Sequence, residues 1–89
     1  MKDAYLEVTF RRGKPIAAYY YLPRRRGQKS HKSVRTDAGL IIDFNRYGKP
    51  IGIEITAPNL VSAAILNRVL KTLGLPLVRP SELQPLKAA

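Results

Sequence analysis

The sequence predicts an α+β domain in which two consecutive β-hairpins form an antiparallel sheet and one C-terminal α-helix packs on a face of it. Three observations support this fold class. Apolar residues alternate with other residues in four short stretches, and an apolar stripe at helical spacing follows the last of them. The tetrapeptide GKPI also occurs twice, at residues 13–16 and 48–51, each time between two alternating stretches.

The four alternating stretches are expected to be strands, because period-two alternation is typical of a strand with one buried face. The residues that share the apolar face are Leu6, Val8 and Phe10; Ile16, Ala18, Tyr20 and Leu22; Leu40, Ile42 and Phe44; and Ile51, Ile53 and Ile55. The segment SVRT, at 33–36, is compatible with a further strand.

The two GKPI copies are interpreted as hairpin turns. Gly13 and Gly48 can adopt positive φ at the end of a turn, where a Cβ atom would be unfavourable. Pro15 and Pro50 lack an N–H group and suit the start of a strand. A phosphate-binding loop is not indicated, since neither copy belongs to a GxxxxGKS pattern or is followed by a helical pattern.

The helix is predicted from the stripe of Ala63, Leu66, Leu70 and Leu73, with polar residues on the opposite side. Thr56 or Asn59 is expected to cap it, with Pro58 in the first turn, and Gly74 followed by Pro76 is expected to end it. The sequence therefore predicts a single domain over residues 1–75, and residues 76–89 are predicted to be an extended, proline-containing arm.

Size and composition bound the function. The chain has 89 residues, a net charge of +10 and no cysteine, so disulfides and thiolate catalysis are excluded. It contains no long apolar run for a membrane span, and its N-terminal stretch lacks the pattern of a signal peptide. A cytoplasmic location without a membrane partner is expected. The positive charge favours anionic partners, namely nucleic acid, an acidic protein or an acidic membrane surface.

The densest cationic stretch is the predicted basic loop at 23–35, where six of the twelve residues from 24 to 35 are Lys or Arg. These are Arg24, Arg25, Arg26, Lys29, Lys32 and Arg35. They are the candidate nucleic-acid-binding residues, because clustered cations neutralise phosphates.

Tyr19 and Tyr21 lie on one face of the second predicted strand. We expect them to form an apolar interface, either under the C-terminal arm or against another subunit, which predicts a homodimer or a larger assembly. Stacking on nucleobases beside the basic loop is the alternative.

No catalytic site, metal site or cofactor is predicted. Asp43 and Glu54 are expected on the same outward face of paired strands, where such acids are usually solvated or paired with cations. His31 is the only histidine and lies among cations without a second ligand close in sequence. One histidine and no cysteine do not supply a nucleophile, a base and an orienting group.

The segment GLIIDFNRYGKPIGIEITAP, from Gly39 to Pro58, resembles the signature of domain-of-unknown-function family 2283. The matching pattern is a glycine, a hydrophobic pair, Asp43 and an aromatic residue, then a turn with glycine and the run Gly-Ile-Glu-Ile. The stretch from Ala4 to Phe10 is similar to the family's first strand. The resemblance implies a β-rich fold without an established activity, and some members are suspected antitoxins that bind a protein partner.

These observations predict a small non-enzymatic binding protein that engages nucleic acid through the basic loop. The alternative is a protein-binding module, such as an antitoxin that neutralises a small toxin. A third possibility is a structural or assembly subunit. The residues leave open whether the partner is DNA, RNA or an acidic protein.

Overall fold

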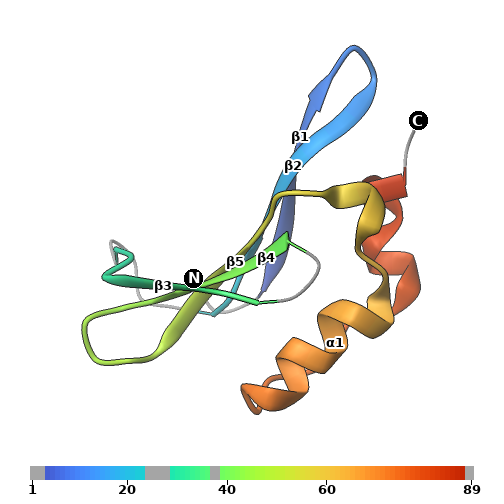
Figure 1. The fold of residues 1–89 in the computed structure, drawn as a ribbon. Helices are drawn as coiled ribbons and strands as arrows, with labels where there is room; N and C mark the ends of the chain where they lie inside the picture. Colours follow the sequence, from blue (N-terminus) through green and yellow to red (C-terminus); the bar gives the residue numbers. More distant parts are fainter. Residues whose placement is uncertain (1–3, 24–28, 37–38, 88–89) are drawn as a thin grey trace.

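The computed structural model describes residues 4–23, 29–36 and 39–87, and contains one five-stranded antiparallel sheet (Figure 1). The strands are β1 (Tyr5–Arg11), β2 (Lys14–Tyr21), β3 (Lys32–Arg35), β4 (Leu40–Phe44) and β5 (Pro50–Ile55). They lie in the order β1-β2-β5-β4-β3, so that β1 and β3 form the two edges. The α+β class and the antiparallel sheet are as predicted.

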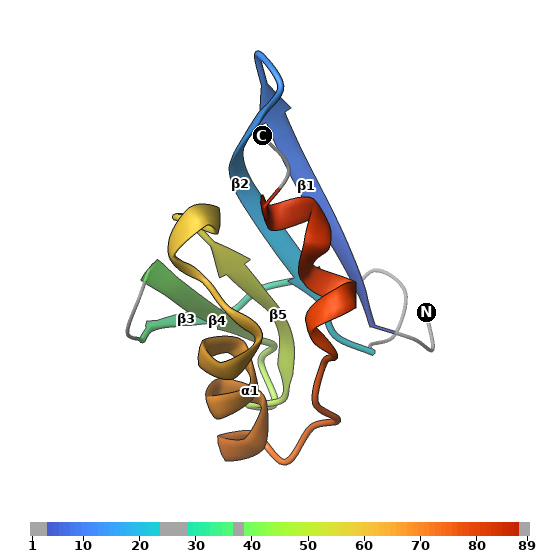
Figure 2. The same ribbon diagram turned by 90° about the vertical axis from the view of Figure 1, so that its right-hand side faces the viewer.

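Helical segments cover one face of the sheet and leave the other face open (Figures 1 and 2). They are η2 (Pro58–Leu60), α1 (Ala63–Thr72) and η3 (Pro80–Lys87), of which η2 and η3 are 3₁₀ helices. The core between the layers is formed by buried residues from both sides: Ala18, Tyr20, Leu22, Leu40, Ile42, Ile53, Ile55, Val61, Leu66, Leu70, Val78, Leu83 and Leu86. The alternation therefore identified the covered face correctly except at Phe10 and Ile16, which are 48% and 47% exposed because the end of the first hairpin extends beyond the covering helices.

Both GKPI copies form hairpin turns followed by a β-bulge. Gly13 and Gly48 have φ values of 77° and 80°. In the first hairpin Phe10 pairs with Pro15 and Thr9 with Ala17, which leaves Ile16 as the inserted residue. The second hairpin repeats this pattern around Pro50, because Phe44 pairs with Pro50 and Asp43 with Gly52. A proline cannot donate to the ladder, so a register shift beside it disrupts little pairing.

The number of strands differs from the prediction of two hairpins alone. Residues 32–35 form β3, which pairs antiparallel with β4 and places Lys32 opposite Phe44 and Arg35 opposite Ile41. This short strand is exposed along its whole length, so it lacks the hydrophobic alternation that identified the other four. The two predicted hairpins are present as β1–β2 and β4–β5, with β3 as an additional edge strand.

The predicted start of the helix is wrong and its predicted end is confirmed. Pro58 begins η2, and α1 begins after Ser62, whose Oγ accepts a hydrogen bond from the Ile65 N–H at 3.3 Å. At the other end Gly74 has a φ of 71° and donates its N–H to the Lys71 carbonyl. Together with the bond from the Leu75 N–H to the Leu70 carbonyl, this is a Schellman motif.

The predicted extended arm is also wrong, because Pro80–Lys87 is helical and residues from 78 onward complete the core. Val78, Leu83 and Leu86 are each at most 4% exposed. Asn67 of α1 fixes the approach to η3, since its side chain donates to the Val78 carbonyl at 3.0 Å and accepts from the Val78 N–H at 2.7 Å. Val78, Leu83 and Leu86, which belong to the segment predicted to lie on a neighbour, pack instead in this chain's own core.

Candidate nucleic-acid interface

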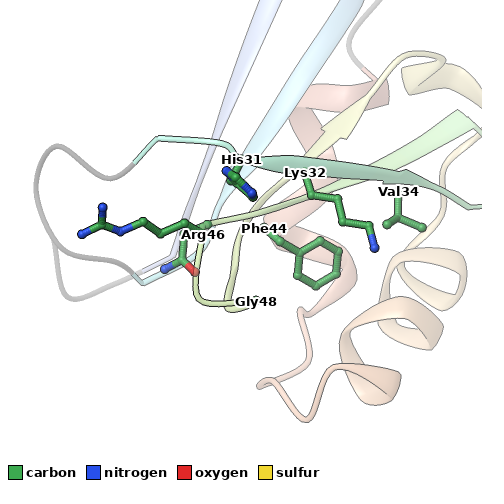
Figure 3. A pocket seen from close by; sticks show the side chains of 7 residues that line it. His31, Lys32, Val34, Phe44, Arg46 and Gly48 are labelled. Atoms are coloured by element: carbon green, nitrogen blue, oxygen red, sulfur yellow. The ribbon is translucent and has the colours of Figure 1, made fainter.

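A shallow hollow with a basic rim lies at the β3 edge of the sheet (Figure 3). It has a volume of about 340 Å³. His31 directly precedes β3, Lys32 is its first residue, and Arg46 and Gly48 come from the turn between β4 and β5. Phe44 and Val34 provide its apolar surface, and Phe44 also packs against the core.

Backbone pairing explains why these segments meet. The His31 N–H donates to the Phe44 carbonyl at 2.7 Å, and Lys32 lies opposite Phe44 in the ladder. The start of β3 is therefore held beside the end of β4, where the β4–β5 turn begins. Lys29 and Lys49 flank the hollow's residues in the chain and are exposed. We call Lys29, His31, Lys32, Arg46 and Lys49 the basic edge.

The basic edge is not neutralised by acids within the described part of the chain. None of the described residues that line the hollow is acidic. In residues 4–23, 29–36 and 39–87 the one ion pair joins Arg79 to Glu82, at 3.2 Å. The positive potential of the edge is therefore available to an anion from solution.

A buried asparagine holds the turn that carries Arg46. Asn45 is 5% exposed, and its Oδ1 accepts hydrogen bonds from the N–H groups of Tyr47 and Lys49 at 2.9 and 3.0 Å. Tyr47 is 74% exposed, and the Arg46 guanidinium lies 4.9 Å from the centre of its ring. The arginine head group and an exposed aromatic ring are thus presented together on a fixed turn.

The structure divides the predicted nucleic-acid-binding residues into three groups. Arg24, Arg25 and Arg26 lie outside the described residues. Lys29 and Lys32 belong to the basic edge. Arg35 lies opposite Ile41, on the open face of the sheet, whereas Lys32 lies opposite Phe44 on the covered side. Alternation along β3 therefore directs Lys32 and Arg35 to opposite faces.

Sequence reasoning missed Arg46 and Tyr47, because the NRYGK segment was interpreted only as a hairpin turn. The signal that would have revealed them is the pairing of β3 with β4. Once residues 32–35 are recognised as a strand antiparallel to β4, the basic loop and the second GKPI turn must lie at the same end of the sheet.

The tyrosines form a separate feature on the open face. Tyr21 stacks with Tyr5 and with Tyr19, with ring centres 4.5 and 4.6 Å apart. The Tyr19 ring also lies over Gly52, where any Cβ atom would collide with it. Two parallel rings at such distances occupy both faces of Tyr21, so a nucleobase could stack there only by displacing a tyrosine.

The C-terminal segment does not cover Tyr19 and Tyr21, because η3 packs on the opposite face with the core. The role of these two residues in an interface between subunits stays a prediction. The stacking of Tyr21 with both Tyr5 and Tyr19 removes part of the apolar surface on which that prediction was based.

Asp43 and Glu54 lie on the open face as predicted, but Asp43 is not simply solvated. Its carboxylate accepts short hydrogen bonds from Tyr19 Oη and Ser33 Oγ, both at 2.6 Å. These bonds tie β2, β4 and β3 together across the sheet. In the described segments no group of three or more His, Cys, Asp or Glu residues is arranged to hold a metal ion.

Comparisons with protein-family models, with curated proteins and with solved structures gave no significant match to this chain. The resemblance to domain-of-unknown-function family 2283 therefore stays a prediction. Over the part of the chain that the structure describes, no helix has the length and apolar character needed to cross a membrane.

Proposed function

We propose that this chain is a non-enzymatic nucleic-acid-binding protein that holds phosphates along its basic edge. The observation that carries the proposal is that Lys32 and Arg46, from two separate segments, line one hollow without an acidic residue among its described lining. Cations arranged in this way release counterions when they meet a phosphate backbone, which makes binding favourable.

The apolar part of the hollow supports a polymer rather than a free anion. Phe44 and Val34 offer a surface against which a sugar or a base can pack while the rim contacts phosphates. Exposed Tyr47 adds a second aromatic group beside the rim. The contacts predicted for Arg24, Arg25 and Arg26 lie outside the described residues and stay a prediction.

The test compares two double variants that remove the same charge. Lys32→Ala with Arg46→Ala alters the basic edge, while Arg68→Ala with Lys71→Ala alters exposed positions on α1. Binding to a fluorescein-labelled oligonucleotide is measured by anisotropy between about 50 and 200 mM salt. We expect the edge variant to reduce the slope of log affinity against log salt by about 1.8, since each phosphate contact contributes roughly 0.9.

The helix variant controls for net charge and should change the slope much less. Equal effects of the two variants would mean that charge alone attracts the oligonucleotide, and the edge would not be the site. If the wild-type chain binds no oligonucleotide but captures a small acidic protein, the antitoxin-like alternative would replace this proposal.

A further inference from the structure

The end of the first hairpin projects from the sheet as a two-stranded ribbon, which we call the hairpin arm (residues 9–17). Strand β5 pairs with β2 only over Ala18–Tyr21, so the preceding part of β2 is paired with β1 alone. Figures 1 and 2 show the arm extending beyond the rest of the described chain in both views.

The arm exposes apolar side chains that an isolated hairpin has no reason to carry. Phe10 is 48% exposed and Ile16 is 47% exposed. A two-stranded hairpin without a third strand or a covering helix is marginally stable in water. Large exposed apolar side chains at the end of such a ribbon therefore indicate that a partner covers it.

The charge at the tip shows what kind of partner fits. Arg11, Arg12 and Lys14 lie within four residues of one another and are all exposed. Arg12 has a φ of 53° and Gly13 a φ of 77°, the signs that a type I′ turn requires, so the cations are held at a tight end. A second copy of the chain would bring the same cations to the contact and be repelled.

We infer that the hairpin arm enters the major groove of double-stranded DNA, an inference that rests on the proposal that the chain binds nucleic acid. The major groove of B-form DNA, roughly 12 Å wide, admits a two-stranded β-ribbon. The arginines and the lysine at the tip can contact phosphates or guanine edges, and Phe10 and Ile16 can contact thymine methyl groups. The major groove of A-form RNA is too narrow for such a ribbon.

The arm and the basic edge are separate contacts. The arm continues from the end of β2 that lies opposite Ile55, whereas the basic edge surrounds the β4–β5 turn at the other end of β5. The edge alone would accept single strands or duplexes, while the arm provides the preference for duplex DNA. The two proposals can therefore be tested independently on the same chain.

The experiment measures affinity for a duplex DNA, a duplex RNA and a single-stranded DNA of one sequence. The arm variant is Arg11→Ala with Lys14→Ala, and the control is again Arg68→Ala with Lys71→Ala. We expect wild-type protein to prefer duplex DNA, and the arm variant to lose that preference while its salt slope on duplex DNA falls by up to about 1.8. Arg12 is left unchanged so that both central residues of the tight turn, where its φ is 53°, stay as in the wild type.

Two further measurements report on the groove itself. Phe10→Ala with Ile16→Ala should weaken duplex binding without changing the salt slope, because these side chains carry no charge. Bound protein should protect guanine N7, in the major groove, from dimethyl sulfate, and leave adenine N3, in the minor groove, reactive. Far-ultraviolet circular dichroism should show that all variants keep the sheet.

Separate outcomes overturn the two proposals. If the edge variant weakens binding to every nucleic acid while the arm variant behaves like the helix control, the arm is not a DNA contact and the proposed function stands. Protection of adenine N3 in place of guanine N7 would refute the major-groove placement. If neither the arm variant nor the edge variant differs from the control, both proposals are wrong.

Discussion

The two hairpins contain the same tetrapeptide at their turns, but the isoleucine of that tetrapeptide lies in opposite environments. In each, a phenylalanine pairs with the proline of GKPI and the following isoleucine is the inserted residue of a bulge. Yet Ile51 is fully buried whereas Ile16 is 47% exposed. The repeated residues therefore determine the local backbone, and the surrounding chain determines whether that backbone is covered.

The turns differ by one residue, and this difference has a physical cause. Between phenylalanine and proline the first hairpin has RRGK and the second has NRYGK. Arg12 and Gly13 both take positive φ in the shorter turn, whereas in the longer one the Asn45 side chain replaces part of the backbone pairing. A short turn with few side-chain contacts suits a projecting arm. A turn held by side-chain hydrogen bonds suits a surface that must keep its shape.

The largest expected contrast is between the two isoleucines. Ile51→Ala should reduce the free energy of unfolding by about 2–5 kcal/mol, because a fully buried side chain leaves a cavity. Ile16→Ala should change it by less than about 1 kcal/mol, because about half of that side chain is already in water. Urea denaturation followed by circular dichroism measures both. Similar losses would mean that the arm is covered in solution by the protein itself or by a second copy.

The next contrast concerns the residue after each phenylalanine. Asn45→Ala should reduce the free energy of unfolding by about 1–3 kcal/mol, since the N–H groups of Tyr47 and Lys49 lose their acceptor. Arg11→Ala, at the matching position of the first hairpin, should stay within about 0.5 kcal/mol because it is exposed. Asn45→Asp keeps an acceptor oxygen and should recover part of the loss. A neutral Asn45→Ala would show that water replaces the side chain.

The sequence predicted the shared features of the hairpins and not their separate positions. Alternation, positive φ at Gly13 and Gly48, and the helix end at Gly74 follow from local chemistry, and all are present. The burial of Ile51 and the exposure of Ile16 depend on which segments pack above each strand. Such packing joins segments far apart in the chain, as where η3 contacts β1 and β2, and no local pattern encodes it.

The candidate site was only partly predictable for a similar reason. The concentration of cations between residues 24 and 35 is visible in the sequence, and Lys32 lies on the hollow. Arg46 reaches the same hollow through the pairing of β3 with β4, a contact between segments that no local pattern encodes. A strand near 33–36 was compatible with the sequence, but an exposed four-residue strand of mostly polar residues has too little alternation to reveal its pairing partner.

A smaller contrast is expected for the turn glycines. Gly48→Ala should reduce the free energy of unfolding by about 1 kcal/mol or slightly more, because φ is 80° and the open space around it leaves only backbone strain. Gly13→Ala imposes the same strain at φ 77°, but the arm can open without the rest of the sheet, so global stability should fall less. Hydrogen exchange should show faster opening of residues 9–17 in that variant. An equal global loss would show that the arm unfolds together with the sheet.

The smallest contrast lies within β2, between the uncovered arm and the covered stretch that begins at Ala18. Burial, and to a smaller extent the negative charge of Glu82, raises the pKa of Tyr20 above its usual value of about 10. The folded chain therefore favours the neutral phenol, and its contribution to stability is complete below about pH 10. As the pH rises from about 10 through the folded pKa, the unfolded chain ionises first and stability falls.

The free energy of unfolding of Tyr20→Phe, measured by urea denaturation at pH 8–11, should fall less steeply with pH than that of wild type. For Glu82→Gln the fall should be intermediate. The three proteins share every titratable group except Tyr20 and Glu82, so the differences between their curves report on this pair. Parallel curves for wild type and Tyr20→Phe would mean that water reaches the phenol and that η3 does not keep this part of the hairpin covered.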